Sequence, residues 1–405
     1  MVKALHLGPD AVIRKREKKT VAVIGAGMAG MSAALGMLCK GHTVRLYESK
    51  SAPLNRQDDA GHRMLHPTIN FWPDQEGYLE TSTNLPFLEW YQGECKAIVE
   101  MLREEWRGYV KNYAPRLRFL NNRLVTNVTA GSNRKYKLWI DDGADDEGMY
   151  DIVIATAGFK EEVAPPAFPT PNYWHPDMLN RKIEESGSSC FTVSGAGDGG
   201  LIDALRSLLK FDDGKLAFRF TELLQGTSVH DHLKSAERRF KDSLKTGELS
   251  DADRQKIRIE YDAAASAFFN ASSCDLDADF RACGSDTMDC APKGKTCRLA
   301  YAHSLFVESR IPRRSLYLVD NEINNIAFSK AAPIHKFLIS LIERDGTVQF
   351  EKGNLVEVDG KFQIHPDVGA AIDIPKKSLI YARHGASTNF KQVLNIDDKV
   401  VFNKG

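Results

Sequence analysis

Two glycine-rich stretches, each directly after a short apolar run, constrain the fold of this chain more than any other feature. The first is VAVIGAGMAG at residues 21–30, and the second is FTVSGAGDGG at residues 191–200. Fifteen residues from Val21 align with fifteen from Phe191, and seven of them are identical. One such stretch is weak evidence for a nucleotide site. Two of them in similar settings predict an internal duplication.

The first half alternates strand and helix patterns. A β-branched, apolar strand at residues 20–24 precedes the glycines, and the helix pattern after them ends at Gly41. A second strand, TVRLYES, closes on Glu48, and DIVIATAGF is a later buried strand. We also predict a long helix over residues 86–110, with Pro86 in its first turn.

The second half repeats this layout. CFTVS precedes the glycines, LIDALRSLLK follows as a helix, and KLAFRFTELL is predicted as a strand that ends near Glu222. After an insert come the strand RSLYLVD, the helix APIHKFLISLIERDG and the strand SLIYARHGA. Alternating strands and helices imply a mostly parallel sheet. We therefore predict an α/β fold with two Rossmann-like doubly wound domains from an internal duplication.

The pattern also predicts domain boundaries. A tail over residues 1–19 precedes the first Rossmann-like domain at residues 20–160. The second domain begins at residues 161–225, is interrupted by a charged, helical insert at residues 226–302, and resumes at residues 303–405.

One apolar stripe runs along the predicted insert. Ser250 and Asp253 predict a capping box at the start of a helix. Apolar side chains then recur at helical spacing, and we expect them to pack on the parent domain. A lid, or a surface for a protein partner or a second copy of the chain, is the alternative. The stripe consists of Ile257, Tyr261, Ala264 and Phe268.

Charge and cysteine usage narrow the class of protein. Lys plus Arg equals Asp plus Glu, 54 each, which argues weakly against a partner such as nucleic acid or an anionic membrane. Residues 21–39 are uncharged, but four glycines make a strand and helix a better interpretation than a membrane span.

The seven cysteines form no CxxC pair, and no apolar secretory signal precedes residue 20. We expect a cytoplasmic protein with reduced thiols and no metal site, the segment 274–297 being an exposed loop.

Each glycine of the first motif has its own physical role. Gly25 permits the tight turn out of the strand, Gly27 lets the backbone approach a pyrophosphate, and Gly30 allows close packing of helix on strand. The helix N-terminus offers N–H groups to phosphates, and a carboxylate at the end of the next strand accepts hydrogen bonds from ribose hydroxyls. The sequence thus predicts a dinucleotide site formed by Gly25, Ala26, Gly27, Met28, Ala29, Gly30 and Glu48.

The second motif predicts a similar site at Gly195, Gly197 and Gly200, with one irregularity. Asp198 places a carboxylate in the loop, where it either points outward, binds a ribose or weakens anion binding. Glu222, at the end of its predicted strand, would favour NADH over NADPH by repelling a 2′-phosphate. The alternative is a degenerate copy that is kept for its fold.

With these motifs the chain resembles two-dinucleotide-binding-domain flavoproteins, the broad group that includes disulfide reductases and class B flavin monooxygenases. The matching residues are VIGAGMAG with Glu48, DIVIATAGF around Gly158, and SGAGDGG. The resemblance covers most of the chain outside the insert. It implies FAD at the first motif, NAD(P)H at the second, and a crossing between the domains near Gly158.

Two features depart from that family. The redox cysteine pair of the disulfide reductases is missing, which argues against that activity. YARHGAST occupies the place where the family usually carries a Gly-Asp pair near the flavin ribityl chain.

Three side chains outside the glycine motifs are candidates for chemistry. In the loop GHRMLHPTINFWP, Arg63 is predicted to pair with a phosphate, and His66 is either catalytic or structural. His384 ends a strand of the second half, where it is either an acid or base or part of a surface turn. His62 and His66 imitate a zinc pair, but no third ligand is apparent.

Three functions fit these observations. The first is an FAD-dependent oxidoreductase that takes hydride from NAD(P)H and passes electrons to oxygen or a small organic acceptor. The second is a flavin oxidase or dehydrogenase acting on an amine or similar donor, with an inert second site. The third is a non-catalytic FAD- or NAD-binding sensor whose insert contacts a partner.

Overall fold

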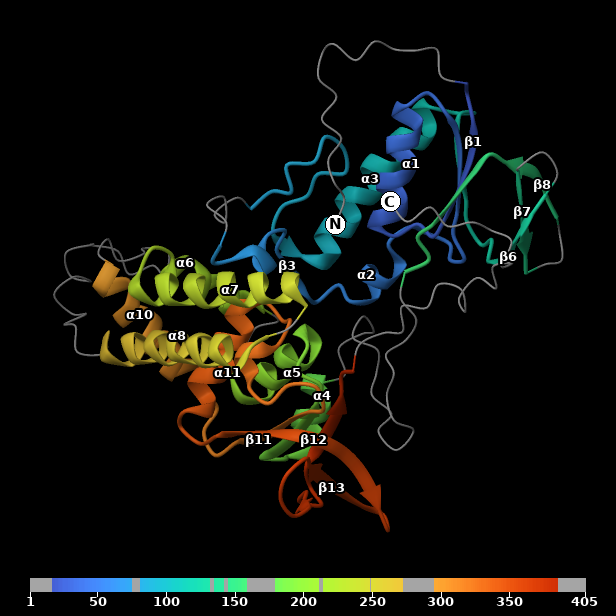
Figure 1. Ribbon diagram of the computed structural model, residues 1–405. Coiled ribbons are helices and arrows are strands. Elements are labelled where there is room, and N and C mark those ends of the chain that lie inside the picture. The colour runs from blue at the N-terminus through green and yellow to red at the C-terminus, as the bar shows by residue number, and fades with distance from the viewer. Residues whose placement is uncertain are drawn as a thin grey trace.

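The computed structural model describes residues 17–74, 81–131, 135–141, 145–158, 179–210, 214–247, 249–271 and 295–384. Two α/β units follow each other along the chain, and each is built on a parallel sheet (Figure 1). A group of helices lies beside the second sheet and reaches the first unit near the short strand β3 (Met64–Leu65) (Figure 1).

The first sheet has the order β5-β2-β1-β9, and every neighbouring pair is parallel. Its central strand carries the first glycine motif at its carboxyl end. The strands are β1 (Thr20–Ile24), β2 (Thr43–Tyr47), β5 (Leu117–Leu120) and β9 (Ile152–Ala155).

The second unit repeats this order with β12-β11-β10-β15, again with parallel neighbours. In both units the strand before the glycines lies between the next parallel strand and the last one. The predicted pair of Rossmann-like units from an internal duplication is therefore confirmed. These strands are β10 (Cys190–Ser194), β11 (Ser315–Asp320), β12 (Val348–Val358) and β15 (Leu379–Ala382).

Helices cover one face of each sheet. Val21 and Val23 of β1 pack in one core cluster with Met31, Leu35 and Ile98 from two helices. In the second unit the matching helices pack on Phe191 and Val193 of β10. The four helices are α1 (Met28–Cys39), α3 (Cys95–Asn112), α5 (Asp198–Leu208) and α11 (Pro333–Glu343).

Antiparallel strands cover the other face, where a doubly wound sheet would have more helices. Ala22 and Ile24 of β1 pack against Val125 and Leu138 of a separate three-stranded sheet. In the second unit β12 continues into an antiparallel extension of the main sheet. These strands are β6 (Val125–Ala130), β7 (Tyr136–Ile140) and β8 (Asp145–Tyr150), and β13 (Lys361–Pro366) and β14 (Ile372–Asp373).

The helix predicted over residues 86–110 begins nine residues late, at Cys95. Gly93 and Glu94 form the short strand β4, which pairs with Leu65 and Met64 of β3. Pairing as a strand and forming the first turn of a helix require different backbone conformations. The tendency of proline to start helices therefore gave a wrong boundary here.

The insert between α5 and β11 is helical over more residues than predicted. Its helices are α6 (Lys215–Leu224), α7 (Ser228–Thr246), α8 (Asp251–Asn270) and α10 (Lys295–Ser309). The strand predicted at residues 215–224 was wrong. Its buried apolar residues recur at positions 216, 217, 220, 223 and 224, which is a helical period.

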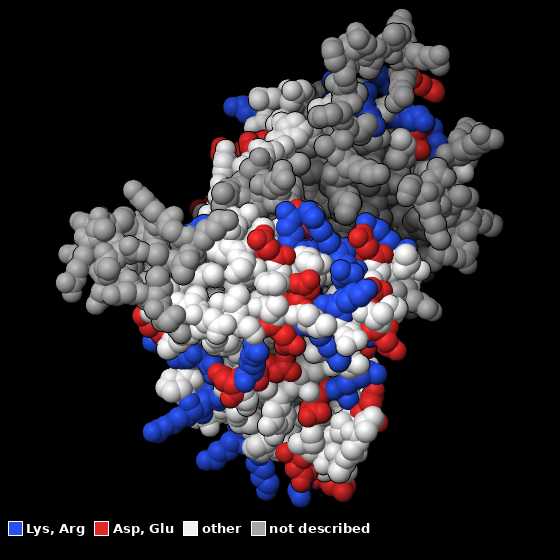
Figure 2. Space-filling view, turned by 60° about the vertical axis from the view of Figure 1, so that its left-hand side comes forward, with Lys and Arg blue, Asp and Glu red and all other residues white. Residues whose placement is uncertain are grey.

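The insert packs on its parent unit. The Ser250 side chain caps α8 by accepting a hydrogen bond from the Asp253 amide at 3.2 Å. The predicted stripe from Ile257 to Phe268 is buried in the same core cluster as β10 and α11. A partner for the outer surface of the insert stays a prediction. On the face drawn in Figure 2, Lys and Arg are interspersed with Asp and Glu over the residues that the structure describes.

A loop of the first unit is anchored on the insert. Trp72 is fully buried in the core cluster of the second unit, and its Nε1 donates to Gln225 Oε1 at 3.1 Å. Asp74 pairs with Arg238 and Lys241 of α7 at 2.7 and 3.4 Å. The short elements near this loop and before β10 are α2 (Asn55–Asp59), η1 (Ile69–Phe71) and α4 (Leu179–Ser186).

The uncharged segment 21–39 forms β1 and α1, as the sequence predicted. Within the described ranges, none of the helices has both the length and the apolar character that crossing a membrane requires.

Candidate nucleotide sites

The first glycine loop has the geometry that its motif predicts. Gly25 has a φ of +98°, and a Cβ there would lie 2.5 Å from the Thr156 carbonyl oxygen. A Cβ at Gly30 would lie 1.8 Å from the Gly25 carbonyl oxygen. A Cβ at Gly27, in contrast, would meet nothing within 4 Å. Two glycines are thus required by the fold, whereas the middle one borders open space.

The second loop repeats this division. Gly195 has a φ of +106°, and its Cβ would lie 2.2 Å from the Arg383 carbonyl oxygen. A Cβ at Gly200 would lie 1.9 Å from the Gly195 carbonyl oxygen, and one at Gly197 would meet nothing within 4 Å. The open space therefore borders the same position of both loops.

Both helices after the glycines begin without a side-chain cap. The N-cap of α1 is Gly27 and that of α5 is Gly197, and neither helix has a side-chain hydrogen bond at its N-cap. Their first N–H groups and the positive end of each helix dipole lie next to the open space. This arrangement favours an anion such as a phosphate.

Glu48 stands directly after β2 and fixes the first loop. Its Oε2 accepts a hydrogen bond from the Ala26 amide at 2.8 Å. Its Oε1 accepts from the Lys50 amide at 2.9 Å and from Ser49 Oγ at 3.0 Å. The carboxylate is therefore held at the end of the strand beside the open space.

Asp320 ends β11 and makes the same contacts in the second unit. Its Oδ2 accepts from the Ala196 amide at 2.8 Å, and its Oδ1 accepts from the amides of Glu322 and Ile323 at 2.8 and 3.1 Å. The glycine motif and its spacing did not predict Asp320. SLYLVD ends in an acid as TVRLYE does, and comparing the two strand ends would have identified Asp320.

Glu222 does not occupy the position predicted for it. It lies on helix α6, where its Oε2 pairs with Arg219 Nη1 at 3.1 Å. The prediction assumed that the strand next to β10 follows α5 directly in the chain. The insert separates the two, and β11 with Asp320 lies beside β10 instead.

Asp198 is turned onto the start of α11. Its Oδ1 accepts from the Ala332 amide at 2.7 Å and contacts His335 Nδ1 at 3.0 Å. Burial acts to raise the pKa of this carboxyl group, but the hydrogen bonds and charge of its partners outweigh burial and lower the pKa. The loop carboxylate thus has its own partners on α11.

A cavity of about 600 Å³ lies at the second loop. It opens at the carboxyl ends of β10, β11 and β15, the edge where open parallel sheets bind ligands. Residues 194–199 form one wall. The rest of the lining includes Asp320, Lys330, Asn354 and His384.

Two neighbouring residues after β15 have different surroundings. His384 is exposed, and its Nε2 lies 2.7 Å from Ser194 Oγ. Arg383 is buried, and its Nε donates to Asp203 Oδ2 at 2.7 Å. His384 therefore combines access to the cavity with a fixed hydrogen-bond partner.

The remaining predicted residues lie nearer the first unit. The His66 ring lies 5.1 Å from the Phe218 ring, and burial lowers the His66 pKa to about 4. These surroundings favour the structural interpretation of His66. Arg63 is buried, and its predicted phosphate contact stays a prediction. Gly158 has a φ of +76° and follows Thr156, whose Oγ1 donates to the Gly25 carbonyl oxygen at 2.9 Å.

Cys39, Cys95 and Cys190 are free thiols in the described ranges. Cys95 is buried, its Sγ donates to the Gln57 carbonyl oxygen at 3.2 Å, and burial raises its pKa to about 11. The thiols of the segment 274–297 lie outside the described side chains. Among the residues whose positions are described, no group of three or more His, Cys, Asp or Glu side chains is placed to hold a metal ion.

No protein-family model matches the sequence, and no functionally curated protein matches it. Solved structures similar to it include the bacillithiol disulfide reductase Bdr of Bacillus cereus. That comparison has 11% identity and a TM-score of 0.46, and covers 94% of this chain and 81% of the other. Lactococcus lactis thioredoxin reductase gives 11% identity, 94% and 83% coverage, and a TM-score of 0.43. The FAD-bound form of OTEMO is 12% identical, with 94% of this chain and 73% of the other covered and a TM-score of 0.42.

Proposed function

We propose that the protein is an FAD-dependent oxidoreductase that takes hydride from NADH, with FAD at the first glycine loop and NADH at the second. One observation carries the proposal. Both loops have open space at the middle glycine, an uncapped helix start and an acid on the adjacent strand that holds the loop. A loop that served only as a turn would need none of these three features.

The residues present fit the phosphates and riboses of two dinucleotides. The space beside Gly27 and Gly197 lets a pyrophosphate approach the backbone, where N–H groups of the helix start can donate to it. Each carboxylate oxygen accepts more than one hydrogen bond. Glu48 and Asp320 can therefore hold their loops and still accept from ribose hydroxyls.

Asp320 now carries the preference for NADH that the sequence analysis assigned to Glu222. A carboxylate at the end of the second strand accepts from a ribose 2′-hydroxyl and repels a 2′-phosphate. Lys330 also lines the cavity, but it is an exposed lysine with a flexible side chain. We therefore propose NADH rather than NADPH as the donor.

The flavin, when bound, would accept the hydride and pass both electrons on, in the simplest case as NADH + H⁺ + O₂ → NAD⁺ + H₂O₂. The chain's own residues bind and orient the two nucleotides. His384 is proposed to face the nucleotide in the second cavity as an acid or base, held there by Ser194. A small organic acceptor in place of oxygen is equally compatible with these residues.

An absorbance spectrum of the purified protein, before and after anaerobic addition of NADH, tests the proposal. A flavin spectrum that bleaches is the expected result, because it requires both sites and the direction of hydride transfer. A flavin that stays oxidised with NADH but bleaches with an amine would contradict the role of the second site and favour an oxidase. A colourless protein that takes up no added FAD would overturn the assignment of the first site.

A further inference from the structure

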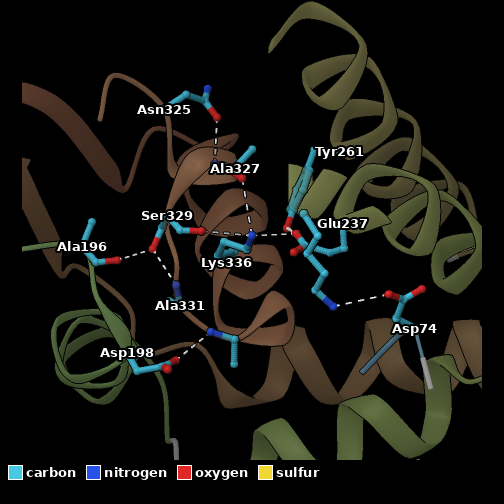
Figure 3. Close-up of polar contacts among 12 residues, drawn as sticks. Asp74, Ala196, Asp198, Glu237, Tyr261, Asn325, Ala327, Ser329, Ala331 and Lys336 are labelled. Carbon is cyan, nitrogen blue, oxygen red and sulfur yellow. Dashed lines mark hydrogen bonds and ion pairs between the residues drawn. The ribbon is translucent and has the colours of Figure 1, made fainter. Parts of the chain in front are cut away.

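A buried lysine connects the insert to the second nucleotide loop. Lys336 of α11 is fully buried, and its Nζ lies 2.6 Å from Glu237 Oε1 on α7 (Figure 3). The Tyr261 hydroxyl of α8 donates to the same Glu237 oxygen at 2.7 Å. Two helices of the insert therefore converge on one ammonium group that belongs to the parent unit.

The ammonium also holds the segment before α11. Lys336 Nζ donates to the carbonyl oxygens of Ser329 and Ala327 at 3.2 and 3.4 Å. The phenyl ring of Phe240 lies 4.8 Å from Nζ on another side. The positions of Ala327 and Ser329 thus depend on a cation whose paired carboxylate, Glu237, comes from the insert.

The same segment contacts the glycine loop. Ser329 Oγ donates to the Ala196 carbonyl oxygen and accepts from the Ala331 amide at 3.0 Å (Figure 3). Asp198, two residues further along the loop, accepts from the Ala332 amide at 2.7 Å. Ala196 is therefore fixed on its N–H side by Asp320 and on its carbonyl side by Ser329.

We infer that Glu237 and Lys336 are positioning residues for the second nucleotide loop, and that the insert serves to hold this loop in its binding geometry. The inference rests on the proposed function, because it assumes that the loop binds NADH. The chain of contacts runs from Glu237 to Lys336, then to the Ser329 carbonyl, and through the Ser329 hydroxyl to Ala196. Glu237 and Lys336 act through the loop and do not themselves contact the nucleotide.

A contribution to packing alone would need no ion pair at this place. A buried pair of charges loses much of its Coulombic gain to desolvation, and apolar side chains of similar size often stabilise a core as well. What an apolar side chain cannot do is donate hydrogen bonds to two backbone carbonyls. The donor function of Lys336 therefore distinguishes positioning from packing.

The test compares Lys336→Met with the double variant Glu237→Gln, Lys336→Met, using FAD-loaded protein. Lys336→Met leaves Glu237 buried without its cation, so we expect lower stability and an NADH dissociation constant raised about tenfold or more. The double variant removes both charges, so its thermal unfolding should recover the part of the loss that came from the unpaired Glu237 carboxylate. Its affinity for NADH should stay about tenfold weaker than that of the wild type, because the carbonyls of Ala327 and Ser329 still lack their donor.

Ile257→Ala is the matched control. This side chain is fully buried in the insert and makes no polar contact, so its loss destabilises the insert without removing a donor from the loop. Folded Ile257→Ala protein should bind NADH like the wild type. A double variant that binds NADH with wild-type affinity would overturn the inference and leave the pair a packing role. Wild-type protein that takes up FAD but never binds NADH would contradict the proposed second site itself, which is a separate result.

Discussion

Glu48 and Asp320 hold their glycine loops by the same hydrogen bond, since each carboxylate accepts from the alanine amide between the first two glycines at 2.8 Å. The residues lie 272 positions apart, in two units with the same order of parallel strands. A contact that serves only the fold would survive in the second copy with many different side chains. An acid at both positions supports the proposal that both loops bind a nucleotide.

Asp320→Ala should weaken NADH binding about tenfold or more. The substitution removes the acceptor for the Ala196 amide and for the ribose hydroxyls, and a hydrogen bond to a charged group contributes about 1.5–3 kcal/mol. Discrimination against NADPH should fall as well, because the negative charge near the 2′-position is gone. Titration of protein fluorescence with each nucleotide measures both effects.

Glu222→Ala is the control for that experiment. The Glu222 side chain is 42% exposed on α6, so its removal should leave NADH affinity unchanged. Loss of NADH affinity in Glu222→Ala with retention in Asp320→Ala would show that the acid has been assigned to the wrong residue.

Gly197→Ala and Gly195→Ala should separate folding from binding at the second loop. A methyl group at Gly197 meets open space, so apo protein should unfold near the wild-type temperature while NADH affinity falls steeply. A methyl group at Gly195 would lie 2.2 Å from a backbone oxygen, at a φ of +106°. Gly195→Ala should therefore unfold at a lower temperature than both the wild type and Gly197→Ala. Thermal unfolding with and without NADH measures both. Undiminished NADH affinity in Gly197→Ala would contradict a pyrophosphate at this loop.

Local patterns in the sequence were sufficient to predict the two parallel units and the geometry of the first glycine loop. An apolar strand, a spaced set of glycines and an acid after the next strand all fall within 28 residues, from Val21 to Glu48. Backbone sterics tie each glycine to one role, so the pattern leaves few alternatives. The buried stripe of α8 was predictable for the same reason, because helical spacing is a local property.

Spacing after the glycines could not locate the second acid, because its place depends on which strands pair. Nearly 120 residues separate Asp320 from Gly200, and the helical insert between them contains an apolar stretch that imitates a strand. The hydrogen bond of Asp198 to the Ala332 amide and the ion pair of Lys336 with Glu237 depend likewise on packing between distant elements. Sequence spacing carries no information on such contacts until the fold is known.

His384→Ala should lower kcat by about 10²-fold and leave NADH affinity within about twofold, as expected for loss of an acid or base. Ser194→Ala should give a smaller loss, because the imidazole remains but loses the hydroxyl that lies 2.7 Å from its Nε2. Steady-state rates and NADH titration of both variants check this. An unchanged kcat in His384→Ala would leave His384 as a residue of a surface turn.

His66→Asn should make the protein less sensitive to mild acid. Burial lowers the folded pKa of His66 from its ordinary 6.5 to about 4. As the pH falls below 6.5, the unfolded chain therefore binds a proton at this position that the folded chain does not bind until about pH 4. His66 thus lowers the stability of the wild type progressively between these two values, and Asn, which does not titrate, removes that loss.

The measurement is urea unfolding of both proteins near pH 7.5 and near pH 5, so that all other titrating groups cancel in the comparison. Asparagine keeps an acceptor for the Thr68 amide, which His66 Nδ1 now binds at 3.1 Å. On going to the lower pH, the free energy of unfolding should fall more for the wild type than for His66→Asn. An equal fall in both proteins would mean that His66 titrates normally in the folded protein, and its packing against Phe218 would then have to be looser than 5.1 Å between ring centres suggests.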